Sequence, residues 1–232
     1  MYKHKIKIAV GALILSSSLI ASNTALSNYS YSEFKESSIN IGLSALEVSD
    51  RKDNRSQLFY PNDKDSFSDN TFFELSVRGS IYEANGLETM ITFNGSFNLS
   101  NDVTTVNKYG ITLGENLSLN GGILNLRIGY EKERIAELDL EVDEFGIGTS
   151  FFVPIGNSFE LGMAYDYETS FGGDMDTSSN KYSIPLVYNI NDEEAVSFSY
   201  SMKTLDIDTK TNPNIKTKFD QNIIYIGYSI KL

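Results

Sequence analysis

The fold is decided by the last ten residues of the chain, Ile223-Ile224-Tyr225-Ile226-Gly227-Tyr228-Ser229-Ile230-Lys231-Leu232. Counting back from Leu232, every second residue is large and apolar, whereas Lys231, Ser229 and Gly227 between them are polar or small. A period of two places alternate side chains on opposite faces of a strand. The stretch therefore predicts a β-strand with one apolar face and one polar face.

An apolar-faced strand that runs to the last residue resembles the closing strand of bacterial outer-membrane β-barrels, where it also serves as the assembly signal. That class usually ends in Phe, and Leu232 takes the place of Phe here. The resemblance implies a small single-chain barrel of the porin-like or surface-antigen class. It also implies contact with outer-membrane lipid and lipopolysaccharide, and with the barrel-assembly machinery through the last strand.

The first 27 residues have the pattern of a secretory signal peptide. Lys3, Lys5 and Lys7 precede an apolar run over residues 8–21, and small residues suited to cleavage follow, ending at Ala25 or Ser27. The apolar run is short for a membrane span, although a retained anchor is the alternative. We therefore expect residues 1–27 to be cleaved and residues 28–232 to form one barrel domain in the outer membrane of a Gram-negative bacterium.

Composition narrows the function classes. The expected mature chain of about 205 residues is long enough for one all-β domain. Removing the three lysines of residues 1–27 from 19 basic residues leaves 16 against 31 acidic ones, a net charge of −15, which disfavours nucleic acid as a partner. There is no cysteine, so packing or a closed sheet must provide the stability.

Ten segments with period-two alternation follow residue 28, and the connections between them alternate between short and long. Asn120-Gly121 is the strongest two-residue hairpin signal. A turn there places Leu117 opposite Leu124 and Leu113 opposite Ile128, so the apolar faces match. The even number of strands and the alternating connections predict an antiparallel up-and-down transmembrane β-barrel, with eight strands as the alternative to ten.

A second short turn is predicted at Ala84-Asn85-Gly86. A three-residue turn with Gly86 left-handed would place Gly79 opposite Ile91 and keep the apolar faces aligned. Polar stretches predict external loops over residues 50–70, 170–180 and 205–221.

Two places depart from the simple alternation. Glu115 falls on the apolar face, so we expect it near the inner membrane interface or beside a bulge. Alternation of acidic and aliphatic residues over Glu137–Asp143 changes parity before Phe145, which predicts a β-bulge at that point.

Both a soluble β-sandwich or barrel and a membrane barrel show this alternation, and they differ in which face points outward. Here the polar set is dominated by Ser, Gly, Asn and Thr, with few of the lysines and glutamates that cover a soluble surface. Aromatic residues gather toward both strand ends, as in interfacial girdles. We therefore expect the polar face to line a confined lumen.

An enzymatic role is not expected. The only histidine of the chain, His4, lies in the predicted signal peptide, and no cysteine is present. Histidine-dependent proton transfer and thiolate chemistry are therefore not available to the mature chain. No cofactor motif is found, no metal is expected, and the loop carboxylates such as Asp174 and Asp176 lack the twelve-residue calcium-loop pattern.

The lumen is predicted to hold nearly balanced charges. The acids expected to point inward are Glu74, Glu131, Glu144, Glu160, Asp166 and Glu168, and the bases are Arg78, Lys108, Arg127, Lys181, Lys203 and Lys231. One hypothesis is a narrow porin-like channel for small hydrophilic solutes, with a constriction built from Arg78, Arg127, Glu74, Glu131, Glu160 and Asp166. The alternative is a salt-bridged plug in a non-conducting surface barrel, whose external loops bind lipopolysaccharide, host or phage.

Overall fold

A computed structural model of the chain describes residues 37–53, 71–84, 87–99, 106–119, 121–135, 140–209 and 216–232. The predicted signal peptide, the turn residues 85–86 and most of the predicted loop 50–70 lie outside them. The described part contains ten strands: β1 Ser38–Asp53, β2 Thr71–Ala84, β3 Leu87–Asn98, β4 Val106–Leu119, β5 Gly122–Ile135, β6 Leu140–Ile155, β7 Phe159–Gly173, β8 Met175–Asn189, β9 Glu194–Thr209 and β10 Lys216–Lys231. Within these residues no helix is long and apolar enough to span a membrane.

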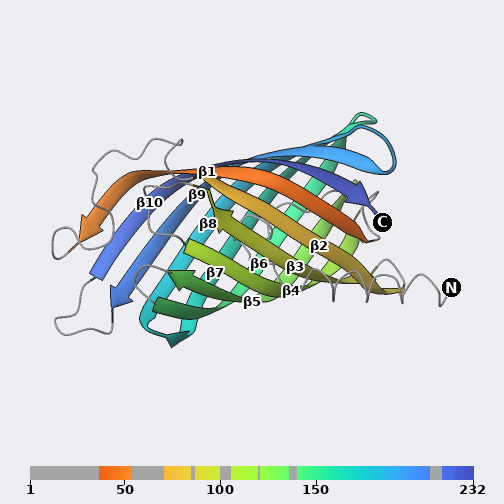
Figure 1. Cartoon of the computed structure of the whole chain (residues 1–232). Coiled ribbons are helices and arrows are strands. Elements are labelled where there is room, and N and C mark those ends of the chain that lie inside the picture. Colours follow the sequence, from red (N-terminus) through yellow and green to blue (C-terminus); the bar gives the residue numbers. More distant parts are fainter. Residues whose placement is uncertain are drawn as a thin grey trace.

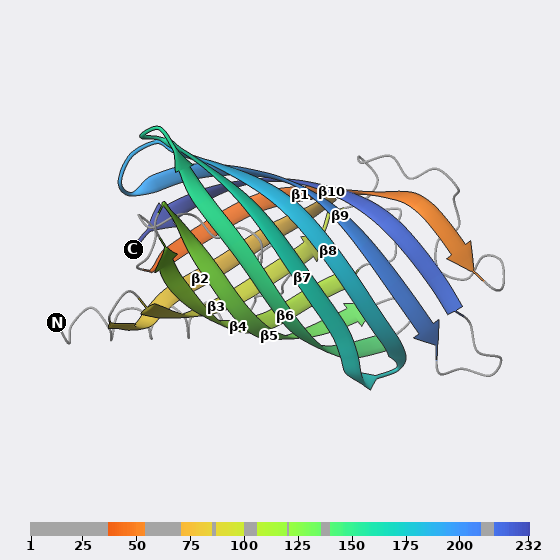
Figure 2. The same cartoon turned by 180° about the vertical axis from the view of Figure 1, so that it is seen from behind.

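The ten strands form one closed antiparallel barrel (Figures 1 and 2). Each strand pairs with its neighbours in the sequence, and β1 closes the ring by pairing with β10. The closing register places Ile39 opposite Ile230 and Leu43 opposite Ile226, so the apolar faces of the first and last strands match. Closure leaves no unpaired strand edge. The predicted ten-stranded barrel is thus confirmed over the alternative of eight strands.

The outer face of the barrel is apolar and the inner face is polar. On β5, Leu126 and Ile128 are 46% and 49% exposed, whereas Asn125 and Arg127 beside them are buried. The same pattern, with apolar side chains exposed and polar ones buried, recurs on the other strands. The outward residues form a continuous apolar band. A soluble barrel buries its apolar face, so this arrangement is that of a transmembrane barrel.

The β4–β5 hairpin has the predicted register. Leu117 lies opposite Leu124 and Leu113 opposite Ile128, as expected from the two-residue turn. Gly121 has a φ of 88°, the left-handed conformation that glycine adopts without a steric penalty.

The β2–β3 hairpin keeps the predicted register by a different route. Gly79 lies opposite Ile91, as predicted, but Ala84 already pairs with Leu87, so the turn is one residue shorter than expected. The extra residue is instead taken up by a bulge at Ile81, between the paired positions on either side. The expected three-residue turn is therefore wrong, although the alignment of the apolar faces that it served is correct.

Glu115 lies on the outer face near this bulge. It is flanked along β4 by the outward-facing Leu113 and Leu117, and it accepts a hydrogen bond from Thr89 on β3. Thr89 in turn pairs with Tyr82, which follows the β2 bulge. The carboxylate is thus partly covered and has a hydrogen-bond donor on the neighbouring strand.

At the other end of the barrel the strands extend beyond the apolar band. The predicted loop over residues 170–180 is wrong, because β7 continues to Gly173 and β8 begins at Met175. Gly173 makes the tight turn with a φ of 94°. Thr177 and Ser179 face inward and donate hydrogen bonds to carboxylates inside the barrel. Part of the predicted loop 205–221 is likewise strand.

The bulge expected near Phe145 is present, but its extra residue belongs to β7. Pairing of β5 with β6 is continuous through this region, whereas pairing of β6 with β7 shifts between Asp143 and Glu144, opposite Phe171. Along β6 the alternation is unbroken, so Val142 and Glu144 both point inward and are buried. The parity change in the sequence therefore reflects the inward Val142, which takes an apolar side chain to the inner face of β6.

Candidate functional site

The turn end of the lumen is closed by apolar side chains. Met90, Phe152, Val187 and Ala195 come from four strands and form one buried cluster inside the barrel, each at most 2% exposed. Gly162 makes room for this cluster, because a Cβ at that position would lie 2.7 Å from the ring of Phe152. The lumen is therefore filled rather than hollow at this level.

A chain of hydrogen bonds runs along the inner wall of the barrel. Asn116 donates to Glu88 at 3.0 Å, Asn125 donates to Asn116 at 2.7 Å, and Arg127 donates to Asn125 at 3.0 Å. Arg78 lies close enough to Glu88 to interact with its charge. Three neighbouring strands, β3, β4 and β5, are thereby tied together by buried polar groups, which rigidifies the interior.

Arg127 and Asp166 form a buried ion pair at the middle of the lumen. Their closest atoms are 2.5 Å apart, and their side chains are 0% and 1% exposed. Arg127 also donates to Ser150 at 2.9 Å, and the ammonium group of Lys181 lies 3.8 Å from Asp166. Gly148 is required beside them, since a Cβ there would lie 2.7 Å from Nε of Arg127.

Closer to the loop end, three buried carboxylates converge. Glu131, Glu144 and Glu168 come from the adjacent strands β5, β6 and β7, and one oxygen of each lies within 4.8 Å of the others. Lys108 lies 3.4 Å from Glu144, and Lys203 lies 3.5 Å from Glu168. This carboxylate cluster, Glu131, Glu144 and Glu168, is the densest group of acids in the described interior that could hold a cation.

All six residues predicted to form a constriction are buried inside the barrel, but they do not form one ring. Arg127 and Asp166 make the central ion pair, and Glu131 belongs to the carboxylate cluster above it. The other three lie apart from that pair: Glu74 accepts a hydrogen bond from Ser44, Glu160 accepts one from Asn189, and Arg78 lies near Glu88.

Sequence reasoning missed several interior residues. Glu88 is buried and central to the hydrogen-bond chain, although it was not among the predicted inward acids. The parity of β3 was the available signal, because Glu88 is an odd number of residues from the outward Ile91 and Phe93. Tyr225 is 3% exposed and lies against Gly42 and Gly227 inside the barrel. The shared parity of Tyr225 and Gly227 was the available signal for that placement.

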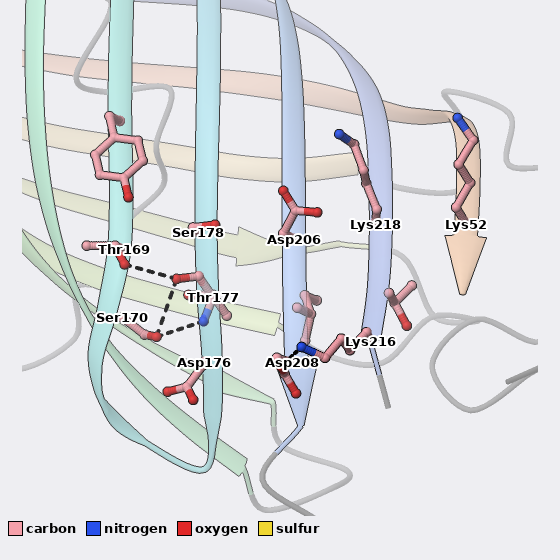
Figure 3. Close-up of a pocket in the computed structure, with 13 residues that line it drawn as sticks. Lys52, Thr169, Ser170, Asp176, Thr177, Ser178, Asp206, Asp208, Lys216 and Lys218 are labelled. Carbon is pink, nitrogen blue, oxygen red and sulfur yellow. Dashed lines mark hydrogen bonds and ion pairs between the residues drawn. The ribbon is translucent and has the colours of Figure 1, made fainter. Parts of the chain in front are cut away.

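A cleft of about 620 Å³ lies at the loop end of strands β7 to β10 (Figure 3). It is lined by Lys52, Tyr167, Thr169, Ser170, Asp176, Thr177, Ser178, Asp206, Ile207, Asp208, Lys216, Thr217 and Lys218. Thr169, Ser170 and Thr177 form one hydroxyl-rich wall, in which the backbone nitrogen of Thr177 donates to Ser170 at 2.7 Å. The loop residues proposed from the sequence as contact points therefore lie partly in ordered strand.

The acidic residues of the cleft lie on β8 and β9, and its lysines lie on β10 and β1. Asp176 on β8 lies opposite Asp208 on β9, and Asp206 lies beside them on the acidic side. Lys216 and Lys218 on β10, with Lys52 on β1 opposite Lys218, form the basic side. Lys216 binds Asp208 at 2.8 Å where the two sides meet. That hydrogen bond raises the pKa of Lys216 above its ordinary value, so Lys216 stays protonated and positively charged at neutral pH.

No protein-family model matches this chain, and no curated protein matches it in sequence. Similar solved structures are barrels. Against the OmpT outer-membrane protein of Vibrio cholerae the identity is 12%, the TM-score is 0.39, and the match covers 69% of this chain and 56% of the other. This chain thus spans little more than half the length of that protein.

Two further similar structures are matched over nearly their whole length. The KdgM porin in complex with disordered oligogalacturonate is 8% identical, with a TM-score of 0.42 and coverage of 84% of this chain and 99% of the other. The outer-membrane protease OmpT of Escherichia coli is 11% identical, with a TM-score of 0.42 and coverage of 88% and 99%. These likenesses are ones of fold alone.

Proposed function

We propose that this chain is a non-conducting barrel of the bacterial outer membrane that binds phosphorylated sugars of lipopolysaccharide at its loop-end cleft. The observation that best supports a non-conducting barrel is the burial of charged side chains at the middle of the barrel. The side chains of Arg127, Asp166 and Lys181 are each at most 1% exposed there, so they have almost no contact with water. An open pore requires lumen side chains that contact water.

The apolar cluster at the turn end supports the same proposal. Met90 and Phe152 are 0% and 1% exposed, and no ion passes an apolar seal of that kind without losing its hydration. The porin-like channel expected from the sequence is the competing function. It would require both the apolar cluster and the central ion pair to move aside.

The position of the cleft favours lipopolysaccharide as the ligand. Tyr182 and Met202, 57% and 52% exposed, mark the upper edge of the apolar band on β8 and β9. Asp206 follows Met202 by four residues, which corresponds to roughly 13 Å along a strand. The cleft thus lies just outside the apolar band, at the depth where the phosphates and core sugars of lipopolysaccharide lie.

The chemistry of the cleft matches a phosphorylated sugar. Lys216 and Lys218 alternate along β10 with the buried Thr217 and Phe219, so both lysines point to the outside and are exposed. Together with Lys52 they place three cations along one side of the cleft, of which Lys52 pairs with Asp50 and Lys216 with Asp208 when no phosphate group is bound. The hydroxyl-rich wall offers hydrogen bonds to sugar hydroxyl groups. Binding rather than turnover is proposed, since the sequence carries no histidine beyond His4.

Planar-bilayer recording of the refolded protein tests the closed lumen. We expect the protein to fold, as shown by heat-modifiable migration on a gel, and then to insert into the bilayer without steady conductance steps. The double variant Arg127→Ala with Phe152→Ala removes one side chain from each closed level and should produce leak currents. Steady steps from the unaltered protein would overturn the closed lumen and support the channel.

Binding to purified lipopolysaccharide in detergent tests the cleft. We expect the triple variant Lys52→Ala, Lys216→Ala, Lys218→Ala to lose at least about tenfold in affinity, because each exposed lysine near a phosphate contributes a few tenths to 1 kcal/mol or more. Lys132→Ala is the matched control, since Lys132 is a loop-end lysine paired with Glu141 on the β5–β6 side of the barrel. Equal affinity of the triple variant and the control would remove lipopolysaccharide as the ligand of this cleft.

A further inference from the structure

The carboxylate cluster inside the barrel brings three acids together by strand register. Glu131 and Glu144 lie directly opposite each other on β5 and β6, and Glu168 on β7 pairs with Gly146, two residues further along β6. Their exposed fractions are only 5%, 3% and 3%. All three side chains therefore point into the same small region, shielded from solvent.

Glu131 has no hydrogen-bond partner among the described residues. Both of its carboxylate oxygens are buried, and neither accepts a hydrogen bond. By contrast, Glu144 accepts one from Thr177 and Glu168 accepts one from Ser179 at 3.0 Å. A buried carboxylate without such partners is strongly unfavourable in its charged form, so it either takes up a proton or needs a cation beside it.

The neighbouring lysines meet this need only in part, because Lys108 and Lys203 act on the charge of Glu131 while their ion pairs are made with other carboxylates. Lys108 lies 2.6 Å from Glu133 and 3.4 Å from Glu144, and Lys203 lies 3.5 Å from Glu168. Further toward the turn end, Lys181 and Arg127 share Asp166. Among the described residues of this region, five carboxylates face four cationic side chains, so negative charge is in surplus at Glu131.

The donor set is that of a hard cation. It consists of carboxylate oxygens alone, with no nitrogen or sulfur ligand, and this favours Ca²⁺ or Mg²⁺ over Zn²⁺. Oxygens within 4.8 Å of one another can all reach one Ca²⁺, whose opposite ligands lie about 5 Å apart. Three carboxylates can supply up to six oxygens, and Thr177 and Ser179 hold two of them in orientation through their hydrogen bonds.

From this geometry we infer that Glu131, Glu144 and Glu168 bind one Ca²⁺ ion inside the barrel and that the ion ties β5, β6 and β7 together. The site is separate from the proposed lipopolysaccharide cleft and does not depend on it. Its role is structural: the ion neutralises the surplus charge and cross-links three strands above the central ion pair.

Calorimetric titration of CaCl₂ into the refolded, chelator-treated protein in lipopolysaccharide-free detergent tests the inference. We expect one ion per chain and a higher melting temperature in Ca²⁺ than in chelator. Mg²⁺ should bind more weakly. If CaCl₂ produces neither binding heat nor a shift in melting temperature, the inference is wrong, whatever the outcome of the lipopolysaccharide experiment.

Variants distinguish Ca²⁺ binding at the carboxylate cluster from non-specific Ca²⁺ binding to other acidic residues. Glu131→Gln should lower Ca²⁺ affinity at least about tenfold and, because it removes an uncompensated buried charge, should melt higher than the unaltered protein in chelator. Glu168→Gln provides a second test if the first variant folds poorly. The double variant Asp176→Asn with Asp206→Asn is the control and should bind Ca²⁺ with unchanged affinity. Undiminished binding by Glu131→Gln, or loss of binding in the control, would overturn the assignment.

Discussion

The guanidinium group of Arg127 lies 2.5 Å from the carboxylate of Asp166, and both side chains are closed off from water in the middle of the barrel. β5 and β7 are not neighbours in the sheet, so this pair spans the strand between them. It joins two parts of the wall that no backbone hydrogen bond connects directly. The ion pair thus connects β5 to β7 directly, in the middle of the barrel interior.

Arg127→Ala should destabilise the barrel by about 3 kcal/mol, since it leaves a buried carboxylate without its main partner. The loss should fall at the lower end of the usual range because Lys181 lies 3.8 Å from the same carboxylate. Urea unfolding followed by heat-modifiable migration measures the change. Arg127→Met combined with Asp166→Leu should recover much of the loss. A single variant as stable as the unaltered protein would show that the pair contributes little.

The Thr89 and Glu115 pair on the outer face should be coupled. Thr89→Val removes the hydroxyl that donates to Glu115 and should cost about 1–2 kcal/mol, because the partly covered carboxylate loses its donor. Glu115→Leu should be neutral or stabilising, since the side chain lies between outward-facing leucines on β4. In the Glu115→Leu background, Thr89→Val should cost almost nothing. A cost that is equal in both backgrounds would disprove the coupling.

Two glycine turns should respond differently to alanine. Gly121→Ala should cost about 1–2 kcal/mol from its left-handed conformation alone, because a Cβ there meets nothing within 4 Å. Gly173→Ala should cost more, since its Cβ would also collide with the backbone of Glu141 and Val142. Refolding yield and urea midpoints of the two variants measure the difference. Equal losses would mean that the β7–β8 turn relaxes freely.

Glu194 should confer a small pH-dependent stability at the turn end. Hydrogen bonds from Tyr228 and Asn191 lower the pKa of this carboxyl group below its ordinary value. A group whose pKa is lower in the folded protein stabilises it above the ordinary pKa near 4.3, and this stability is lost as the pH falls through the folded value. The urea midpoint should therefore fall below about pH 4. In Tyr228→Phe, the fall should be smaller; an identical pH profile in this variant would contradict the assignment.

The fold could be predicted because its signals are local. The alternation of Ile224, Ile226, Tyr228 and Ile230 shows an apolar face without any knowledge of neighbours, and the Asn120-Gly121 turn sets the register of its own hairpin. The predictions were wrong where the register between two paired strands shifts at a bulge. The bulge at Ile81 replaced a longer turn, and the extra residue near Glu144 lies across the ladder in β7.

The site was predicted only in part. Parity alone placed Arg127, Glu131 and Asp166 inside the barrel, and they are buried there. The parity of a residue gives the face of the sheet on which it lies but not its position along the barrel axis. Parity therefore could not show that Glu131 meets Glu144 and Glu168. It also could not show that Glu74 and Glu160 lie elsewhere. The polar character of Ser170–Asn180 likewise suggested a loop, because inward hydroxyls that bind carboxylates look like loop residues in sequence.

The sequence by itself determined that the chain forms alternating strands with an apolar face, since a strand's two faces follow from the order of its own residues. Only the tertiary structure decided which charged and apolar side chains fill the lumen at mid-barrel and which carboxylates converge. Those outcomes depend on the stagger between strands and on side chains that meet across the barrel, and both arise from pairings between residues far apart in the chain.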